Sequence, residues 1–176
     1  MGSIYEFEGH CPQIGEGTYI HPEAVLIGSV KIGRGCMICA GAVLRADFAP
    51  ITIGHGSNVQ DNSIIHVGYE EGVVLQDNVL VGHGVILHDV IIKNGSFIGM
   101  GAILLPRVIV EEDAVVGAGA VLPPGFIVPA RKLVLGNPAK IHKDVSDAML
   151  EENKAGLAFY QELTKKYLNG VRKIEP

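Results

Sequence analysis

The sequence contains no tryptophan, and only 6% of its residues are aromatic. A core without large rings must be filled by aliphatic side chains, here Val, Ile and Leu. The sequence also lacks an excess of positive charge: its net charge is −5, and it contains no run of basic residues. This balance argues against nucleic acid as a partner. The length of 176 residues favours one structural domain.

Long apolar runs and a leader segment are missing as well. No stretch reaches the roughly 20 apolar residues that cross a bilayer, so no membrane partner is expected. The start of the chain has no positive segment followed by an apolar one, which predicts no secretory signal. The three cysteines are an odd number, and they indicate a reducing, cytoplasmic setting. Cys36-x-x-Cys39 has no second pair, so we interpret it as buried or turn thiols.

Glycine, in contrast, is abundant, and an aliphatic residue recurs every six positions. A period of six fits neither an α-helix nor a lone strand, and it predicts short strands joined by tight turns. Three strands then make one coil of eighteen residues. The repeat occupies nineteen positions: Ile14, Ile20, Leu26, Ile32, Ile38, Leu44, Ile53, Val59, Ile65, Leu75, Val81, Leu87, Ile92, Ile98, Leu104, Val110, Val116, Leu122 and Val128.

The predicted fold is mainly β: a parallel β-helix of hexapeptide repeats with its aliphatic residues pointing inward. Adjacent coils pair as parallel strands about 4.8 Å apart. Residues 45–52 and 66–74 exceed the repeat, and we expect both to leave the prism as loops, where function tends to reside. The repeat is expected to end near Val128.

A C-terminal α-helix is predicted to follow the β-helix. We assign residues 1–143 to the β-helix and residues 144–176 to the helical segment, within one structural domain. Ser146 suits an N-cap and Gly170 a C-cap. An apolar stripe predicts that the helix packs along the prism or covers an open end. The stripe consists of Leu157, Tyr160, Leu163 and Tyr167.

Three polar residues are predicted to form a column at one corner of the prism. Arg45, His66 and His88 each follow a repeat residue on the same face in successive coils. His83 lies in the coil of His88 but near a different corner. The three histidines can meet on one ion if a neighbouring subunit supplies His83, and a homotrimer closes that contact by symmetry.

A trio of histidine ligands leaves the fourth position of tetrahedral zinc open, which is the arrangement of catalytic zinc. Iron or cobalt can also occupy a site of three imidazoles. The other four histidines are interpreted as surface or turn residues, because histidine prefers partial exposure. These are His10, His21, His55 and His142.

The motifs around these histidines are Arg45-Ala46-Asp47, Ser57 to Asn62, Gly82-His83-Gly84, and Gly136 to Lys140. Over about residues 10–143 the chain resembles the gamma-class carbonic anhydrase family, including bacterial relatives from phenylacetate-degradation and carnitine operons. The resemblance implies that the β-helix is left-handed. It also implies a homotrimer.

The resemblance further implies zinc ligands at His66, His83 and His88, with His83 reaching across the trimer interface. Gln60 matches the residue that orients the metal-bound hydroxide, and Asn58 matches another polar residue of the active site. A metal-bound hydroxide needs such a hydrogen-bond partner to aim its lone pair.

Three charged residues match positions of structural importance in the family. Arg45 and Asp61 match residues that pair across the subunit interface, and Asp47 matches an adjacent structural acid. A charge-assisted pair can hold an interface in register. A purely structural salt bridge is the alternative role for the pair.

The chain departs from the first-described members of that family in two places. Phe48 stands where they carry a glutamate. Their long acidic loop, which bears a proton-shuttling glutamate, is reduced here to residues 67–74, with Glu70 and Glu71 as the only acids. Losing a positioned shuttle should slow turnover. Glu70 or Glu71 can substitute, or the two can be a solvated turn.

The predicted function is reversible hydration of carbon dioxide to bicarbonate by a zinc-dependent lyase. Hexapeptide scaffolds also host CoA-dependent acyltransferases, which use a histidine as base and need no metal. Hydrolysis of an acyl-CoA thioester and a non-catalytic, structural trimer are the remaining alternatives. Phe48 and the short loop keep the last of these open.

Overall fold

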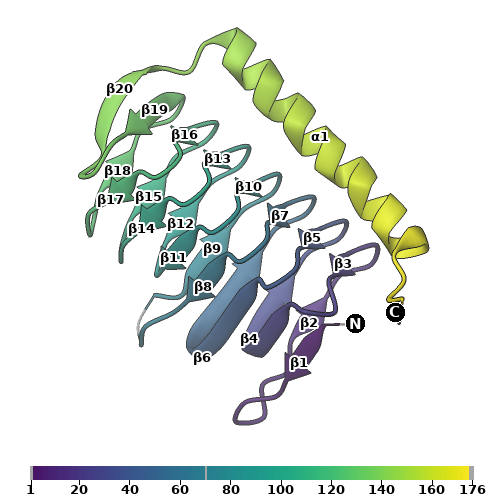
Figure 1. Ribbon diagram of the computed structural model, residues 1–176. Coiled ribbons are helices and arrows are strands. Elements are labelled where there is room, and N and C mark those ends of the chain that lie inside the picture. Colours follow the sequence, from purple (N-terminus) through teal and green to yellow (C-terminus); the bar gives the residue numbers. More distant parts are fainter. Residues whose placement is uncertain (1, 70, 175–176) are drawn as a thin grey trace.

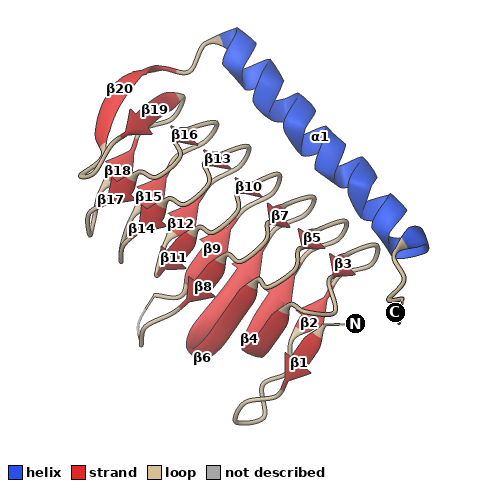
Figure 2. Ribbon diagram, in the orientation of Figure 1, coloured by secondary structure: helices blue, strands red, loops and turns tan. Residues whose placement is uncertain are grey.

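The computed structural model describes residues 2–69 and 71–174. Within these ranges, the chain forms twenty strands, most of them two or three residues long, which build a three-sided prism, and one α-helix lies along it (Figures 1 and 2). The fold is a left-handed parallel β-helix of about seven turns with a C-terminal helix. The six-residue period predicted the β-helix, the family resemblance implied its left hand, and the apolar stripe predicted the helix.

Each face of the prism is a ladder of parallel strands. The second face contains β3 (Tyr19–Ile20), β5 (Met37–Ile38), β7 (Asn58–Val59), β10 (Leu80–Val81), β13 (Phe97–Ile98), β16 (Val115–Val116) and β19 (Lys132–Leu135). The third face contains β1 (Ser3–Tyr5), β8 (Ile64–His66), β11 (Ile86–His88), β14 (Ile103–Leu104) and β17 (Val121–Leu122). The first face contains β2 (Gln13–Ile14), β9 (Val73–Leu75), β12 (Ile91–Ile92), β15 (Ile109–Val110) and β18 (Ile127–Val128).

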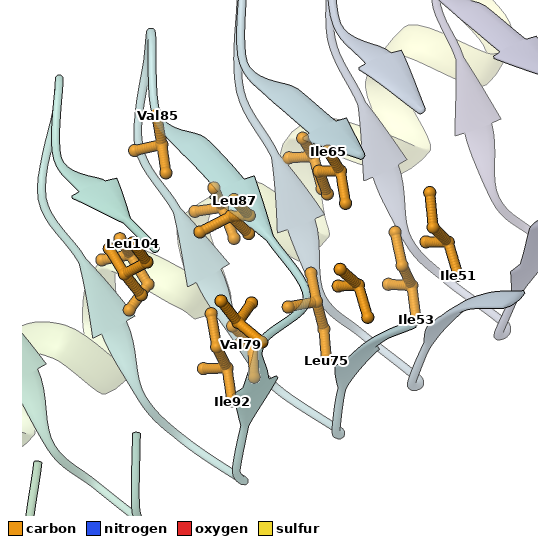
Figure 3. Close-up of a cluster of buried hydrophobic side chains, with 14 of the residues drawn as sticks. Ile51, Ile53, Ile65, Leu75, Val79, Val85, Leu87, Ile92 and Leu104 are labelled. Atoms are coloured by element: carbon orange, nitrogen blue, oxygen red, sulfur yellow. The ribbon is translucent and has the colours of Figure 1, made fainter. Parts of the chain in front are cut away.

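The repeat residues form the core of the prism. All of them are buried except Ile14, which is 36% exposed in the first coil. Figure 3 shows the aliphatic side chains of successive coils stacked inside the prism. The stack continues past the expected end, because Val134 lies six residues beyond Val128 and is fully buried. The aliphatic period therefore determines the core, and it continues for one further strand, in which Val134 stacks on Val116.

Two long strands, β4 (Val25–Ile32) and β6 (Val43–Ile53), belong to both the third and the first face. The expectation that residues 45–52 form a loop is wrong, because these residues remain strand. Arg45, Ala46, Ile51 and Thr52 pair with β4, and residues 47–50 form a bulge between the two paired stretches. The extra residues are absorbed by a register shift between Gly28 and Val30. Gly28 is required at this bend: its φ is +76°, and a Cβ there would lie 2.3 Å from the Ala46 carbonyl oxygen.

The second insertion does leave the prism. Strand β8 ends at His66 and β9 begins at Val73, and the described residues between them, 67–69 and 71–72, lie outside any strand at the corner where β4 and β6 bend. Val67 is buried, whereas Tyr69 is 81% exposed. Glu70, one of the two expected acids, lies outside the described residues.

The far end of the prism is capped by β20 (Lys140–Asp144), which pairs antiparallel with β19. Helix α1 (Asp147–Gly170) then runs back along the second face (Figure 1). Ser146 is the N-cap and accepts a hydrogen bond from the Met149 N–H, as expected. Gly170 is the last helical residue and Val171 is the C-cap, so the expected C-cap was one residue early.

Apolar contacts hold α1 against the prism. Tyr160, Leu163 and Tyr167 pack on Tyr19 and its neighbours on the outward side of the second face. The stripe on the helix thus covers a long side of the prism and does not close an end. No helix in the described part of the chain is long and apolar enough to span a membrane.

Candidate metal centre

The predicted site residues lie at two corners of one chain. Arg45, His66 and His88 pair with one another in successive coils, so the predicted column exists. It stands at the corner where β4 and β6 bend. His83 lies at another corner, in the tight turn that directly follows β10. Within the described residues, no group of three potential ligands comes together in one subunit.

At the first corner, two imidazoles face each other. The Nδ1 atom of His66 lies 3.2 Å from the Nε2 atom of His88, with the rings 77° apart. Two nitrogens bound to one tetrahedral zinc ion at about 2.0–2.1 Å would be about 3.3 Å apart. An imidazole–imidazole hydrogen bond spans the same distance. The distance therefore fits a metal but does not by itself require one.

Each histidine also has a carboxylate beside its other nitrogen. Asp47 Oδ1 lies 3.1 Å from His66 Nε2, with hydrogen-bond geometry. Asp89 Oδ2 lies 3.1 Å from His88 Nδ1, although it is off the direction of a hydrogen bond. Carboxylates in this position orient metal-binding imidazoles and fix their tautomer. The pattern leaves His66 Nδ1 and His88 Nε2, the two facing atoms, as the ligand atoms.

The second corner repeats this arrangement with one histidine. Asp61 Oδ2 lies 2.8 Å from His83 Nδ1, which leaves Nε2 directed elsewhere. The side chain of His83 is 45% exposed, so it can reach a neighbouring molecule. All three predicted ligands thus have a carboxylate partner within the chain. This shared pattern is the strongest structural sign of a metal site.

Gln60 and Asn58, the two polar residues predicted for the active site, lie on the side of the prism that carries His83. The Gln60 Nε2 atom donates a 3.2 Å hydrogen bond to Asn58 Oδ1. Both side chains are nearly completely buried, at 4% and 1% exposure. The Asn58 Nδ2 atom has no hydrogen-bond partner among the described residues. Asn58 and Gln60 are therefore near His83 in their own chain and are not part of the His66–His88 corner.

Arg45 and Asp47 form an ion pair within the chain. Burial raises the pKa of Asp47, but hydrogen bonds from His66 and Arg45 outweigh it and hold the pKa below its ordinary value. Asp47 therefore faces His66 as a carboxylate. The expected pairing of Arg45 with Asp61 of another subunit stays a prediction.

The residues at which the chain departs from the gamma-class carbonic anhydrases, Phe48 and the short loop, lie beside the His66–His88 corner. Phe48 packs against Tyr69, with ring centroids 4.3 Å apart, and its ring lies 6.1 Å from that of His66. Glu71 and Asp89 line a common hollow of about 320 Å³. Of the two expected loop acids, Glu71 is therefore placed near the site.

The sequence reasoning missed Asp89. Its Oδ1 atom accepts a 2.8 Å hydrogen bond from the Gly68 N–H, and its side chain is 13% exposed. Asp89 has a φ of +48°, a conformation that Asp tolerates in turns. The sequence did offer one sign of this role, because Asp89 directly follows His88, the last of the three predicted ligands.

Between the two corners, the third face carries an outward row of aliphatic side chains. Their register follows the strand pairing, and Ile64 and Ile86 are 43% and 40% exposed. The row consists of Val25, Val43, Ile64, Ile86, Ile103 and Val121. An apolar strip between two half-sites is typical of a subunit interface.

Comparison with known proteins finds one family model that matches two segments of the chain and relatives that match nearly all of it. Residues 11–46 and 89–124 match the family model "Bacterial transferase hexapeptide (six repeats)". The carnitine operon protein CaiE of Proteus sp. (strain LE138) is 37% identical over 174 residues, which cover 99% of this chain and 88% of that protein.

Two solved structures match nearly the full chain. A hexapeptide transferase family protein from Anaplasma phagocytophilum aligns with a TM-score of 0.90 and 33% identity, over 94% of this chain and 98% of that one. A Bacillus cereus protein assigned as an acetyltransferase aligns with a TM-score of 0.93 and 32% identity, over 94% and 96%.

Proposed function

The chain belongs to the hexapeptide-repeat proteins, in the family of the carnitine operon protein CaiE, and from this premise we propose a zinc-dependent enzyme that hydrates carbon dioxide reversibly. One zinc ion would be held by His66 and His88 of one subunit and His83 of the next. The observation that carries this proposal is that three histidines, each with a carboxylate beside one nitrogen, lie at the two corners that flank the outward aliphatic row.

The proposal requires a homotrimer. The aliphatic row on the third face lies between the His83 corner and the His66–His88 corner of the same chain. Packing this row against a neighbour would bury Ile64 and Ile86, which are now about two-fifths exposed. A cyclic arrangement of three chains would then join unlike corners at every interface.

Zinc bound to three imidazoles would lower the pKa of a coordinated water to about 7 and so supply a nucleophile for an electrophilic carbon. The residues of the chain have supporting roles. Asp47 and Asp61 would hold the imidazoles of His66 and His83 in one tautomer and orientation, and Asp89 would place a negative charge beside His88 Nδ1. Gln60 is held by Asn58 through Nε2, so its Oε1 atom is the one that can accept a hydrogen bond from water.

Hydration releases a proton in each cycle, and that proton must leave the site. Among the described residues of the loop, Glu71 is the acid that can accept this proton, because its side chain lines the same hollow as Asp89. We propose Glu71 as the proton acceptor. The ring of Phe48 beside His66 would restrict water on that side.

Acyl transfer is the second candidate, and a specific observation favours it. The Anaplasma protein is named for the hexapeptide transferase family and the Bacillus protein is assigned as an acetyltransferase, at 33% and 32% identity. In this function His88 or His66 would act as a general base without a metal. The carboxylate beside each imidazole suits a base as well as a ligand, and it is the third, separate histidine that favours a metal.

Three measurements on one preparation separate the candidates. We expect about one zinc ion per chain, as three ligands per site imply, and carbon dioxide hydration that a chelator removes. We expect no transfer of acetyl groups from acetyl-CoA to amine acceptors. Acetyl transfer that survives the chelator, from protein without bound metal, would instead support the second candidate.

A further inference from the structure

The two ends of the prism carry opposite charges. The near end is the first coil, residues 2–24, which contains four glutamates and neither lysine nor arginine. The far end is the last coil, residues 127–144, which contains four basic residues and one acid, Asp144. Strand β3 at the near end and β20 at the far end are the terminal strands of one eight-stranded sheet (Figure 1). The glutamates are Glu6, Glu8, Glu16 and Glu23, and the basic residues are Arg131, Lys132, Lys140 and Lys143.

The ion pairs of the far end leave Lys140 and Lys143 exposed. Asp144 pairs with Lys132, and Arg131 pairs with the first residue of α1. Lys140 and Lys143 lie on β20, which is exposed along its whole length, and neither pairs with a described residue. The four glutamates of the near end are exposed as well. Seven strand spacings separate β3 from β20, or roughly 34 Å at about 4.8 Å each, so these opposite charges can pair only between two copies.

The two ends of α1 show the reverse order of charge. Helix α1 begins at the far end with Asp147, and Glu151 follows one turn later. The chain leaves α1 at the near end with Arg172 and Lys173, and Lys173 lines a hollow there with residues of the first coil. Stacking two copies head to tail along one axis therefore places acids against bases at both positions. Stacking two near ends would instead bring the glutamates of two first coils together, which is unfavourable.

The aliphatic stack of the prism also ends at exposed residues. Ile141 of β20 pairs with the inward-pointing Val134, and directly opposed residues point to the same side of a sheet. Val134 is fully buried, whereas Ile141 is 50% exposed beyond the last coil. At the near end Ile14 is 36% exposed, and it lines an apolar hollow of about 500 Å³. An aliphatic residue of a following copy would continue the stack there. The hollow is also lined by Ile20, Leu168 and Val171.

We propose that copies of the protein stack head to tail along the prism axis, with β20 of one copy against the first coil of the next. Glu16 and Glu23 lie in the turns before and after β3, where they meet Lys140 and Lys143 across the junction. Ile141 enters the apolar hollow. Because the contact joins unlike ends, it repeats as an open row. A homotrimer would form three junctions at once, so each can be weak. The inference needs neither zinc nor the proposed reaction.

Sedimentation velocity of the full-length protein tests the inference. At about 20 mM salt, where charges act over roughly 20 Å, we expect the mean mass to rise with protein concentration and to pass twice the mass of the smallest unit. At about 500 mM salt, where that range falls to about 4 Å, only the smallest unit should remain. A mass that stops at twice the unit would indicate pairing of like ends and overturn the head-to-tail contact. A mass independent of concentration at low salt would overturn stacking itself.

Two variants with reversed charges should rescue each other. Lys140→Glu combined with Lys143→Glu puts acids on β20. Glu16→Lys combined with Glu23→Lys puts lysines around β3. Either variant alone should associate more than about tenfold more weakly than wild type, because like charges then face each other at the junction. An equimolar mixture should form rows again, in which the two variants alternate. Folded variants that stay apart when mixed would contradict the inference.

Control variants show whether the ends themselves are responsible. Lys93→Glu combined with Lys154→Glu changes the net charge as much as the β20 variant does, but both lysines lie over the middle coils, so this protein should stack like wild type. Ile141→Ala should weaken stacking roughly fivefold. Ile127→Ala should not, because Ile127 is 55% exposed in the last coil but points outward from the first face. Equal effects of either control and its test variant would overturn the inference.

The two proposals can fail separately. Rows formed by a wild-type protein that binds no zinc would leave the stacking in place and overturn the proposed function. Zinc binding and hydration by a protein that never exceeds its smallest unit would overturn the stacking alone.

Discussion

Replacing Asp89 by asparagine tests how the chain holds its metal ligands. The change keeps the size of the side chain and an oxygen that can accept from the Gly68 N–H. It removes the negative charge that lies 3.1 Å from His88 Nδ1. Loss of such a partner weakens metal binding by about 10- to 100-fold, or about 1.4–2.7 kcal/mol. Because the Asp89 side chain is only 13% exposed, solvent cannot replace this charge well.

Competition with a zinc chelator of known affinity would measure this change. Asp77→Asn is the matched control, because Asp77 Oδ1 accepts a 2.6 Å hydrogen bond from the His55 N–H at a different corner. Both variants alter a turn that links two coils, but only Asp89 faces a predicted ligand. We expect Asp77→Asn to keep the wild-type affinity. An Asp89→Asn protein within twofold of wild type would refute the role of the carboxylate.

Three further predictions concern the core, the interface and the thiols. Leu87→Ala should lower the free energy of unfolding by about 2–5 kcal/mol in urea titrations, because it leaves a cavity in a fully buried stack; a loss below 1 kcal/mol would contradict this. Ile86→Asp should produce folded monomers in analytical ultracentrifugation, whereas Ile91→Asp, at similar exposure on the first face, should not; a trimeric Ile86→Asp protein would argue against the interface. At pH 8 the exposed Cys11 thiol should react with a disulfide reagent before the other two, because Cys36 and Cys39 are buried and burial also raises the pKa of both thiols; equally fast reaction of all three before unfolding would be inconsistent with the burial of Cys36 and Cys39.

Much of the fold was predictable because one period governs it. The six-residue spacing defines inward positions, and the same register places His66 on His88 and separates His83 from both. The bend of β6 was not predictable from spacing alone. Extra residues can leave a prism as a loop or stay paired as a bulge, and the pairing with β4 decides between these outcomes.

Side-chain partners were harder to predict than positions. The contact of Asp89 with His88 depends on a residue in the left-handed region, which the repeat pattern does not specify. The apolar stripe indicated that the helix packs on the prism, but the sequence left open whether it lies on a side or an end.

The central claim is that one metal site is built from two subunits, and hybrid trimers test it most directly. His66→Ala and His83→Ala chains, each carrying a different tag, would be expressed together, and trimers with both tags purified. Neither homotrimer should bind metal. In a cyclic hybrid of either composition, one of the three interfaces joins an intact His83 to an intact His66 and His88, so we expect about one zinc ion per trimer. Hybrids without zinc, from chains whose wild-type trimer binds about three, would contradict the claim.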